Sequence, residues 1–476
     1  MEDASSRRVA HAPTLPPAPD GEPPRDETQT DEALTHARAA VAALFGAPRE
    51  RSFDIRYWDG SVEHASAVDA AFTLCVNRRG ALRRMLLPPS ELSIVEAYLS
   101  DDVDIDGSLE GAVSLSDAIS ARIRSPRALA RLLRHLLALP SHEPAPTVRD
   151  ASAKHVVPRA GRPHDPSRDK AAIQYHYDVG NDFYSLWLDR RMVYSCAYFR
   201  TPEDSLDQAQ LAKLDLVCRK LRLRPGERLL DVGCGWGALI MHATRHYGVT
   251  ALGITLSEAQ AEYARARIRE AGLEDRCRVE VLDYRALPAE LQFDKIASIG
   301  MVEHVGEERL RDYFSSLYRA LAPGGLFLNH GIVSEAAARP RGRMERLERT
   351  LWRRDAFIDQ YVFPYGDLVP FRSVITSGES AGFETRDVES LREHYALTLR
   401  HWVARLTRER DRAVAIAGER VFRTWHLYMA ASARAFATAS INVLQTLFAK
   451  PDAQGDAHLP LTREDIFAPD PHAPPG

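Results

Sequence analysis

Arg228-Leu-Leu-Asp-Val-Gly-Cys-Gly-Trp-Gly237 is the stretch of sequence that decides the fold. Its apolar first half predicts a short buried strand. Gly233, Gly235 and Gly237 predict a tight turn into a helix over 238–247, because glycine adopts backbone angles that other residues resist. Glycines also let a ligand approach the main chain closely. A strand, a glycine turn and a helix in this order are typical of nucleotide-binding α/β sheets.

Two details around this loop separate a dinucleotide site from a methyltransferase site. A dinucleotide site expects an acidic residue about 20 positions on, to hold the ribose. Here the second predicted strand, over 249–254, runs into Thr255 instead. Asp231 precedes the glycines, as in the Asp-x-Gly-x-Gly loops of class I methyltransferases, where a carboxylate at the strand end can face the cationic methionine end of the cofactor. The loop therefore favours S-adenosylmethionine.

Strand and helix signals alternate from residue 170 to residue 451. This alternation predicts an α/β fold, a class I methyltransferase doubly wound sheet that is mostly parallel and Rossmann-like. A third strand over 277–282 ends at Asp283 and Tyr284, which we expect to contact the adenine. A fourth strand covers 293–299. Ligands of such sheets bind outside the carboxyl ends of the strands, so these motifs should meet at one edge.

Composition shifts divide the rest of the chain. A smaller N-terminal α+β domain is predicted from strand signals over 53–60 and 71–76 and a helical signal over 92–99. We see no internal repeats. The predicted organisation is a disordered N-terminal segment, an N-terminal domain associated with lipid or membrane, a linker, a catalytic domain and a loose C-terminal tail, over 1–30, 31–140, 141–169, 170–451 and 452–476.

The overall charge and the cysteines exclude several classes of protein. With 62 basic and 66 acidic residues the net charge is -4, which gives no global field for nucleic acid. The cysteines are odd in number and form no CxxC pair, so neither disulfides nor a metal site are indicated, and a reducing cytoplasm fits best. No apolar run approaches the ~20 residues that span a bilayer, and no signal peptide is recognised. The five cysteines are Cys75, Cys196, Cys218, Cys234 and Cys277.

Two basic segments leave alternatives open. The stretch 122–139 predicts a basic amphipathic helix, with leucines on one face and arginines around the other. Its leucines either pack on the N-terminal domain or face a membrane surface. The arginine-rich run over 339–354 is interspersed with acids and favours a solvated helix, with attraction to phosphate headgroups as the alternative. The leucines are Leu129, Leu132, Leu133, Leu136 and Leu137, and the basic residues are Arg127, Arg131, Arg134 and His135.

With these motifs in order, the chain resembles the cyclopropane-fatty-acyl-phospholipid synthase family. The resemblance is strong over 170–451 and weak over the N-terminal domain, where it rests on size and the Trp58-Asp-Gly60 turn. Besides the glycine loop, the motifs that carry it are Tyr175-His-Tyr-Asp-Val-Gly-Asn-Asp-Phe-Tyr184, Met192-Val-Tyr-Ser-Cys-Ala-Tyr198, Glu303-His-Val-Gly306, Phe357-Ile-Asp-Gln-Tyr-Val-Phe-Pro364 and His394-Tyr-Ala-Leu-Thr-Leu399.

The resemblance implies an enzyme that transfers a methyl(ene) group from S-adenosylmethionine to the cis double bond of an unsaturated acyl chain in a phospholipid, forming a cyclopropane. It implies a cytoplasmic protein bound peripherally to the inner membrane face, with a phospholipid bilayer as partner and a homodimer as one oligomeric alternative. Three functional alternatives stay open. They are a methyl- or methylene-branched acyl product, a soluble small-molecule methyltransferase, and a lipid-binding protein without catalysis.

The family's site residues carry over onto matching positions. Those implied to contact the cofactor are Tyr194, Ser195, Asp231, Gly233, Gly235, Gly237, Thr255, Gln260, Asp283 and Tyr284. The family also binds a bicarbonate ion beside the reacting methyl group, and the matching positions are Cys196, Glu303, His330, Ile332 through its backbone, and Tyr395. Two departures are Ser432, where some members carry cysteine, and Gly331, where some carry threonine.

The chemistry explains why such residues are needed. Attack of an alkene on a sulfonium methyl leaves positive charge on the acyl chain, which the enzyme must shield from water. Aromatic faces stabilise such a charge, and Tyr177, Tyr361 and Phe363 are candidates, with core packing as the alternative. Ring closure needs a base, which a bound bicarbonate supplies. Glu303 would orient that ion or relay the proton, and His304 would orient the loop.

Overall fold

The computed structural model describes residues 31–65, 70–115, 119, 126–141, 179–334, 356–363 and 368–467. Several predictions from the sequence fall outside these ranges. They concern the segment 1–30, nearly all of the linker 141–169, the arginine-rich run 339–354, and Tyr177.

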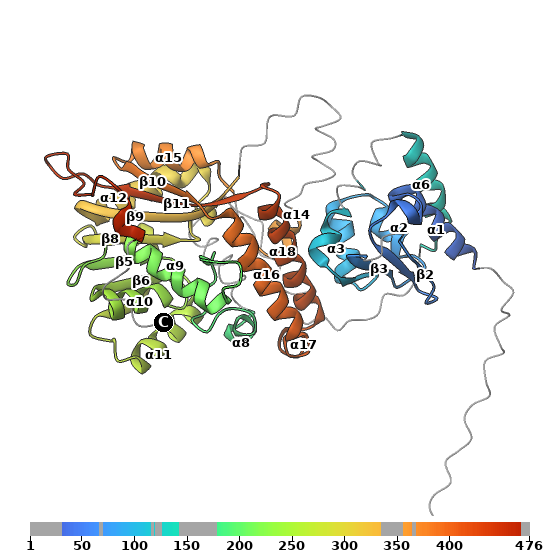
Figure 1. Cartoon of the computed structure of the whole chain (residues 1–476), viewed down its shortest axis with the longest axis horizontal. Coiled ribbons are helices and arrows are strands. Elements are labelled where there is room, and N and C mark those ends of the chain that lie inside the picture. Colours follow the sequence, from blue (N-terminus) through green and yellow to red (C-terminus); the bar gives the residue numbers. More distant parts are fainter. Residues whose placement is uncertain are drawn as a thin grey trace, which may run out of the picture.

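Seven strands form one sheet in the order β10-β11-β9-β8-β5-β6-β7 (Figure 1). The five strands from β9 to β7 are parallel to one another, whereas β11 runs antiparallel to both β9 and β10. The predicted class I methyltransferase sheet is therefore confirmed. The strands are β5 (Arg228–Val232), β6 (Thr250–Thr255), β7 (Cys277–Val281), β8 (Phe293–Ile299), β9 (Leu321–Val333), β10 (Glu384–Ser390) and β11 (Asn442–Ala449).

Helices cover both faces of this sheet. Successive residues of β5 serve different cores, because Leu229 packs with α9, α10 and α11 while Leu230 packs with α12 and α15. A strand buried on both faces reads as a continuous apolar run, which is why 228–232 was recognisable in the sequence. The covering helices are α9 (Leu206–Lys220), α10 (Ala238–Tyr247), α11 (Glu258–Glu270), α12 (Leu310–Ala320) and α15 (Phe371–Ser380).

The N-terminal domain is a second, smaller α+β unit with a four-stranded sheet in the order β2-β1-β3-β4 (Figure 1). The predicted Asp-Gly turn lies between β1 and β2, and α3 covers the segment 92–99 for which a helix was predicted. The elements are β1 (Asp54–Tyr57), β2 (Val62–Glu63), β3 (Phe72–Val76), β4 (Val103–Gly107), α1 (Glu32–Phe45), α2 (Ala81–Leu86), α3 (Glu91–Leu99), α4 (Leu109–Val113) and α6 (Pro126–Ala138), with the short turn η1 (Pro48–Glu50).

The amphipathic helix α6 lies against α1. Leu132 and Leu136 are buried there, and Leu129 and Leu133 are partly buried. The packing alternative is therefore correct for most of the apolar face. Leu137 departs from it, since its side chain is 60% exposed.

Four helices lie between the large sheet and the N-terminal domain (Figure 1). The last of them, α18, packs against α3 and α4, and one hydrophobic core continues across this contact. Arg423 of α18 is buried and donates to Asp101 at 2.9 Å and to Asp104 at 3.2 Å. The four helices are α14 (Ala356–Tyr361), α16 (Arg392–Arg408), α17 (Arg410–Ala417) and α18 (Glu419–Ala437).

The loose tail predicted from Asp452 is not what the structure shows up to residue 467. Ala457 and Ile466 are buried, and α19 (Glu464–Phe467) packs against α9, where Arg222 pairs with Asp465 at 2.7 Å. Two small apolar anchors in a polar stretch explain the error, because composition averages hide them. Among the described helices, none has both the length and the apolar character that crossing a bilayer requires.

Candidate active site

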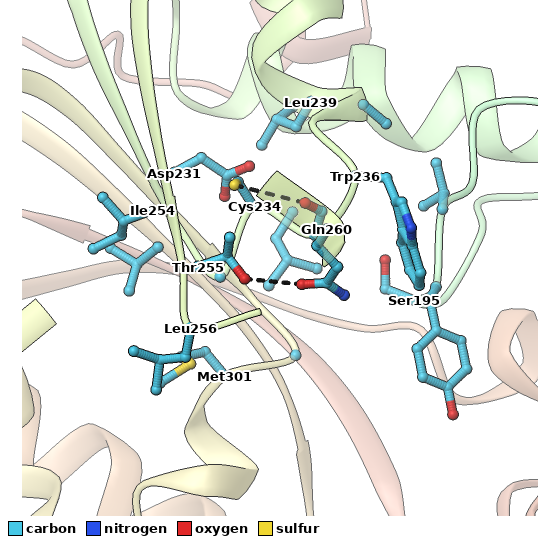
Figure 2. Close-up of a pocket in the computed structure, with 18 of the residues that line it drawn as sticks. Ser195, Asp231, Cys234, Trp236, Leu239, Ile254, Thr255, Leu256, Gln260 and Met301 are labelled. Atoms are coloured by element: carbon cyan, nitrogen blue, oxygen red, sulfur yellow. Dashed lines mark hydrogen bonds between the residues drawn. The ribbon is translucent and has the colours of Figure 1, made fainter. Parts of the chain in front are cut away.

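A pocket lies at the carboxyl edge of the large sheet, where β5, β6, β7 and β8 end (Figure 2). The segment before α9 closes its other side through Tyr194 and Ser195. Of the ten residues expected to contact the cofactor, nine line this pocket: Tyr194, Ser195, Asp231, Gly233, Gly235, Thr255, Gln260, Asp283 and Tyr284. The structure thus gathers residues that lie up to 90 positions apart in the sequence (194 to 284).

Gly237 is the tenth residue, and it does not line the pocket. Its φ of +81° is a left-handed angle that favours glycine, and a Cβ there would lie 3.1 Å from the Cβ of Ala264. Gly237 therefore serves the turn into α10 and its close approach to α11, as the glycine pattern predicted, but not through contact with the pocket.

Two buried charges face the pocket. Asp231 is 3% exposed, and burial raises the pKa of its carboxyl to about 7, an effect that Lys213 opposes. Lys213 of α9 is 2% exposed, and burial lowers the pKa of its ammonium to about 8. Its Nζ donates to Ser195 Oγ at 3.0 Å. Sequence reasoning missed Lys213, although it sits among Ala209, Leu214 and Leu216 on a helix whose apolar neighbours are buried.

Polar side chains at the ends of β6 and β7 are held in place by one another. Thr255 Oγ1 donates to Gln260 Oε1 at 2.8 Å, and both residues are buried (Figure 2). Asp283 pairs with Arg285 at 2.6 Å, and the ring of Tyr284 packs edge-on against Tyr313 at 5.2 Å. This part of the pocket is therefore preorganised.

Aromatic rings form a second wall that the sequence analysis did not anticipate. Trp236, inside the glycine loop, lines the pocket, and its Nε1 donates to Asn181 Oδ1 at 2.8 Å. Its ring lies 5.3 Å from that of Tyr184. Tyr194, which also lines the pocket, lies 5.4 Å from Trp187 and 5.3 Å from Trp402. Asn181 belongs to α8 (Asn181–Ser185), which lies within the family motif 175–184, so this motif contacts the glycine loop directly.

The aromatic candidates named from the sequence divide between two places. The Tyr361 hydroxyl donates to Glu96 of the N-terminal domain, and Arg420 lies 5.5 Å over its ring. Tyr361 therefore belongs to the contact between domains. Phe363 lies beside the pocket, because its ring is 5.7 Å from His304, which lines it.

Glu303 and Ile332 are in direct contact. The short turn η3 (Val302–His304) follows β8, and there Glu303 Oε1 accepts a hydrogen bond from the Ile332 amide at 2.7 Å. The other oxygen, Oε2, is shielded from solvent and has no hydrogen-bond partner in the described part of the chain. Burial raises the pKa of Glu303 to about 7, partly offset by the Ile332 amide. Glu303 as a whole is partly buried, whereas its Oε2 atom is fully enclosed.

His330 is held in one tautomer by two neighbours. Lys220 Nζ donates to Gln445 Oε1 at 2.7 Å, which turns the amide nitrogen of Gln445 toward His330 Nδ1 at 3.1 Å. Nδ1 therefore accepts, and the proton of the neutral ring sits on Nε2. Burial lowers the pKa of His330 to about 3, so the ring is neutral. Among the described residues Nε2 has no acceptor, which leaves an enclosed donor.

Cys196 and Tyr395 lie on the wall formed by α16. Cys196 Sγ is fully buried and donates to the carbonyl oxygens of Ala197 at 3.2 Å and Leu391 at 3.6 Å. Burial raises the pKa of this thiol, so Cys196 is a poor nucleophile at neutral pH. Tyr395, one turn after Leu391, reaches the aromatic wall through Trp402 at 6.0 Å.

None of the five residues matched to the bicarbonate site lines the cofactor pocket itself. Glu303 and Ile332 touch, while Cys196, Ile332 and Tyr395 share one hydrophobic cluster with Tyr194. The motifs around them are joined as well, since Thr398 Oγ1 accepts from the Ala197 amide at 3.0 Å.

The strand order with an antiparallel β11, the glycine turn after β5 and the pocket at the carboxyl edge define an S-adenosylmethionine-dependent methyltransferase. A family model described as mycolic acid cyclopropane synthetase matches residues 164–446, and the chain belongs to this family of cyclopropane synthase-type methyltransferases. A second model, described as a domain of unknown function (DUF7884), matches residues 41–119.

Individual relatives agree with this assignment. A probable fatty acid methyltransferase of Pseudomonas putida is 48% identical over 65% of this chain and 77% of its own length. A probable fatty acid methyltransferase of Mycobacterium tuberculosis, Rv3720, is 36% identical over 89% of this chain and 97% of its own. A solved structure of the mycolic acid cyclopropane synthase CmaA1 complexed with SAH and CTAB is 36% identical, with a TM-score of 0.55 over 60% of this chain and 99% of the other.

Proposed function

We propose that this chain transfers a methylene group from S-adenosylmethionine to the cis double bond of an unsaturated acyl chain in a membrane phospholipid, forming a cyclopropane ring. The observation that carries the proposal is the aromatic wall beside the cofactor pocket, built by Tyr184, Tyr194, Trp236 and Trp402. Bound S-adenosylmethionine supplies an electrophilic methyl group, whose attack by an alkene leaves positive charge on the acyl chain.

The aromatic wall suits such a charge for two reasons. Ring faces attract a cation without offering a nucleophile that would trap it, by about 1–2 kcal/mol each when water is absent. The rings of Tyr184, Trp236 and Trp402 are almost fully buried, so the wall is dry. A dry, apolar wall also suits an acyl chain. The relative CmaA1 binds CTAB, a detergent with a cationic head and a long alkyl chain, which is the same combination of oil and positive charge.

Ring closure needs a base. We propose that a bound bicarbonate ion is this base, as the family resemblance implies. Such an ion would fit this chain where enclosed polar atoms lack hydrogen-bond partners. His330 Nε2 offers a donor and Glu303 Oε2 offers an acceptor, and neither has a partner among the described residues. An ion with both a hydroxyl group and a charged oxygen matches this pair. Glu303 Oε1 accepts from the Ile332 amide at the same time, and Ile332, Tyr395 and Cys196 belong to one hydrophobic cluster.

The substrate would be reached from the cytoplasmic side of the membrane through the N-terminal domain. Arg127, Arg131 and Arg134 are exposed at helical spacing on α6, and Leu137 stands beside them. Basic side chains next to an exposed leucine suit an anionic lipid surface. Replacing the three arginines with glutamine should weaken sedimentation with anionic vesicles at low salt. Unchanged sedimentation would place the membrane contact elsewhere.

A second candidate function is supported by the relatives named fatty acid methyltransferase, which fit a branched product. Expression in a bacterial host that lacks such an activity, grown with methyl-deuterated methionine, separates the two. A cyclopropane keeps two deuterium atoms of the methyl group and has no double bond. A methylene branch also keeps two deuterium atoms but retains a double bond. A saturated methyl branch, formed when that methylene is reduced by the host, keeps two deuterium atoms as well and is heavier than the cyclopropane by two hydrogen atoms. Finding only branched acyl chains would exclude the cyclopropane product.

A further inference from the structure

Lys213 has a role that the functions proposed so far leave unexplained. It lies on α9 beneath the cofactor pocket, lines that pocket, and is 2% exposed. Lysine is almost never fully buried unless its charge is compensated. Its ammonium group has three donors, and among the described residues Ser195 Oγ is the acceptor within hydrogen-bond distance, at 3.0 Å. Two donors are therefore left for a ligand.

Asp231 supplies the opposite charge in the same pocket. It is 3% exposed at the carboxyl end of β5. Lys213 interacts electrostatically first with the buried Asp189, which accepts from the Arg191 and Val193 amides and does not line the pocket, and then with Asp231, which does line it. Within the described part of the chain Lys213 and Asp231 are not hydrogen-bonded to each other. The pocket therefore presents a buried carboxyl group and a buried ammonium group at separate points.

The methionine end of S-adenosylmethionine is an amino acid zwitterion, with an α-ammonium and an α-carboxylate. Resting on the cofactor site proposed above, we propose that Lys213 binds the α-carboxylate of the cofactor while Asp231 faces the α-ammonium. Ser195 completes the subsite, since its Oγ accepts from Lys213 and its hydroxyl proton is available to the same carboxylate. Lys213 keeps its charge for this purpose, because its pKa of about 8 leaves the ammonium as the main form at neutral pH.

The competing explanation is that Lys213 only supports the segment around Ser195. The two explanations differ in which ligand loses affinity when the charge of Lys213 is removed. A carboxylate-binding lysine matters for S-adenosylhomocysteine but not for its decarboxylated analogue. A supporting lysine matters equally for both ligands, because both need the same pocket walls.

Calorimetric titration of the full-length protein with both ligands decides between them. The wild type should bind S-adenosylhomocysteine roughly 10- to 100-fold more tightly than the decarboxylated analogue, the range expected for hydrogen bonds to a charged group. In Lys213→Met this ratio should fall close to one, mainly through weaker binding of S-adenosylhomocysteine. Lys213→Arg, which keeps the cation, should retain most of the ratio. Thermal unfolding of each variant verifies that it is folded, and Lys213→Gln replaces Lys213→Met should that variant not fold.

Equal weakening of both ligands in Lys213→Met would overturn the carboxylate assignment and leave the cofactor site standing. A wild-type protein that binds neither ligand would instead remove the cofactor site, and the subsite with it. The two failures are therefore distinguishable in one series of titrations.

Discussion

Glu303 shows how burial at a single residue gives a carboxyl group properties that suit the proton transfer proposed above. Its Oε2 is enclosed and unpaired among the described residues, and its pKa is raised to about 7. A general acid or base works best when its pKa lies near the operating pH. Perturbed groups beside a pocket are also candidates for function. Glu303 combines both properties, whereas Cys196 has a raised thiol pKa that removes it as a nucleophile.

Glu303→Gln tests this role in the reaction. The amide can hold neither the charge nor the proton, so we expect turnover to fall about 100-fold or more. Affinity for S-adenosylhomocysteine should be nearly unchanged, because Glu303 does not line the cofactor pocket. Steady-state kinetics and calorimetry measure the two quantities. Glu308→Gln, an exposed carboxyl on the same loop, is the matched control. Wild-type turnover in Glu303→Gln would remove Glu303 from the mechanism.

The raised pKa of Glu303 also predicts a pH dependence of stability. The folded state holds the proton more tightly than the unfolded chain, whose carboxyl titrates near 4.5. Its contribution is therefore fully present below about pH 4.5 and is lost as the pH rises through about 7. Relative to Glu303→Gln, the wild type should lose up to roughly 3 kcal/mol of unfolding free energy over this range. Urea unfolding at pH 5 and pH 8 checks the difference, and parallel pH profiles of the two proteins would contradict it.

At the scale of elements, the pairing of β9 with β11 sets the state of His330. The register places His330 opposite Gln445, and α9 brings Lys220 to the far end of the same amide. Three elements that are distant in the sequence therefore fix which ring nitrogen carries the proton. The same helix, α9, also carries Lys213 to the cofactor pocket.

Gln445→Glu should reverse the tautomer. A carboxylate accepts where the amide donated, so the proton moves to Nδ1 and Nε2 loses the donor that an anion needs. Turnover should drop while affinity for S-adenosylhomocysteine holds. Nitrogen-15 NMR of labelled histidine should show Nε2 of His330 shift from a protonated to an unprotonated type. Gln454→Glu, on an exposed loop, is the control. An unchanged Nε2 resonance would contradict the claim that Gln445 sets the tautomer of His330.

The sequence predicted elements best where one residue pattern decided the outcome. The strands over 228–232 and 293–299 and the helix over 238–247 match the structure to the residue, since apolar runs and glycines bound them locally. The cofactor pocket followed, because parallel strands end at one edge. The aromatic wall, the buried Lys213 and the hydrogen bonds from Lys220 through Gln445 to His330 could not be predicted this way. They arise where α8, α9 and α16 pack on the sheet and where β11 pairs with β9, which are tertiary contacts. The tail after Asp452 was mistaken because two buried residues outweigh a polar composition.

At the scale of the whole molecule, the contact between the two domains is polar as well as apolar. Arg423 joins α18 to Asp101 and Asp104, and its Nε also donates to Glu419 Oε1 on the same helix at 2.8 Å. Arg420 bridges to Glu96 at 2.9 Å. Since α18 makes this contact and packs against α16, which carries Trp402 of the aromatic wall, packed helices join the N-terminal domain to the site.

Arg423→Met should loosen this contact. The variant leaves acidic groups without their partner, and we expect a loss of about 2 kcal/mol, below the range of a fully buried pair because Asp101 and Asp104 stay partly hydrated. Differential scanning calorimetry should show a lower Tm, and limited proteolysis should release the N-terminal domain sooner. Arg412→Met, which breaks the exposed pair with Glu409, is the control. Equal effects of the two substitutions would contradict the role of Arg423.

The most direct test of the central claim is to incubate the purified protein with methyl-labelled S-adenosylmethionine and vesicles of a monounsaturated phospholipid, and to analyse the acyl chains by mass spectrometry. The account predicts labelled acyl chains within intact phospholipid that have gained one CH2 group and a ring in place of the double bond. A protein that binds S-adenosylhomocysteine but transfers label only to a soluble small molecule, or to no lipid at all, would contradict it.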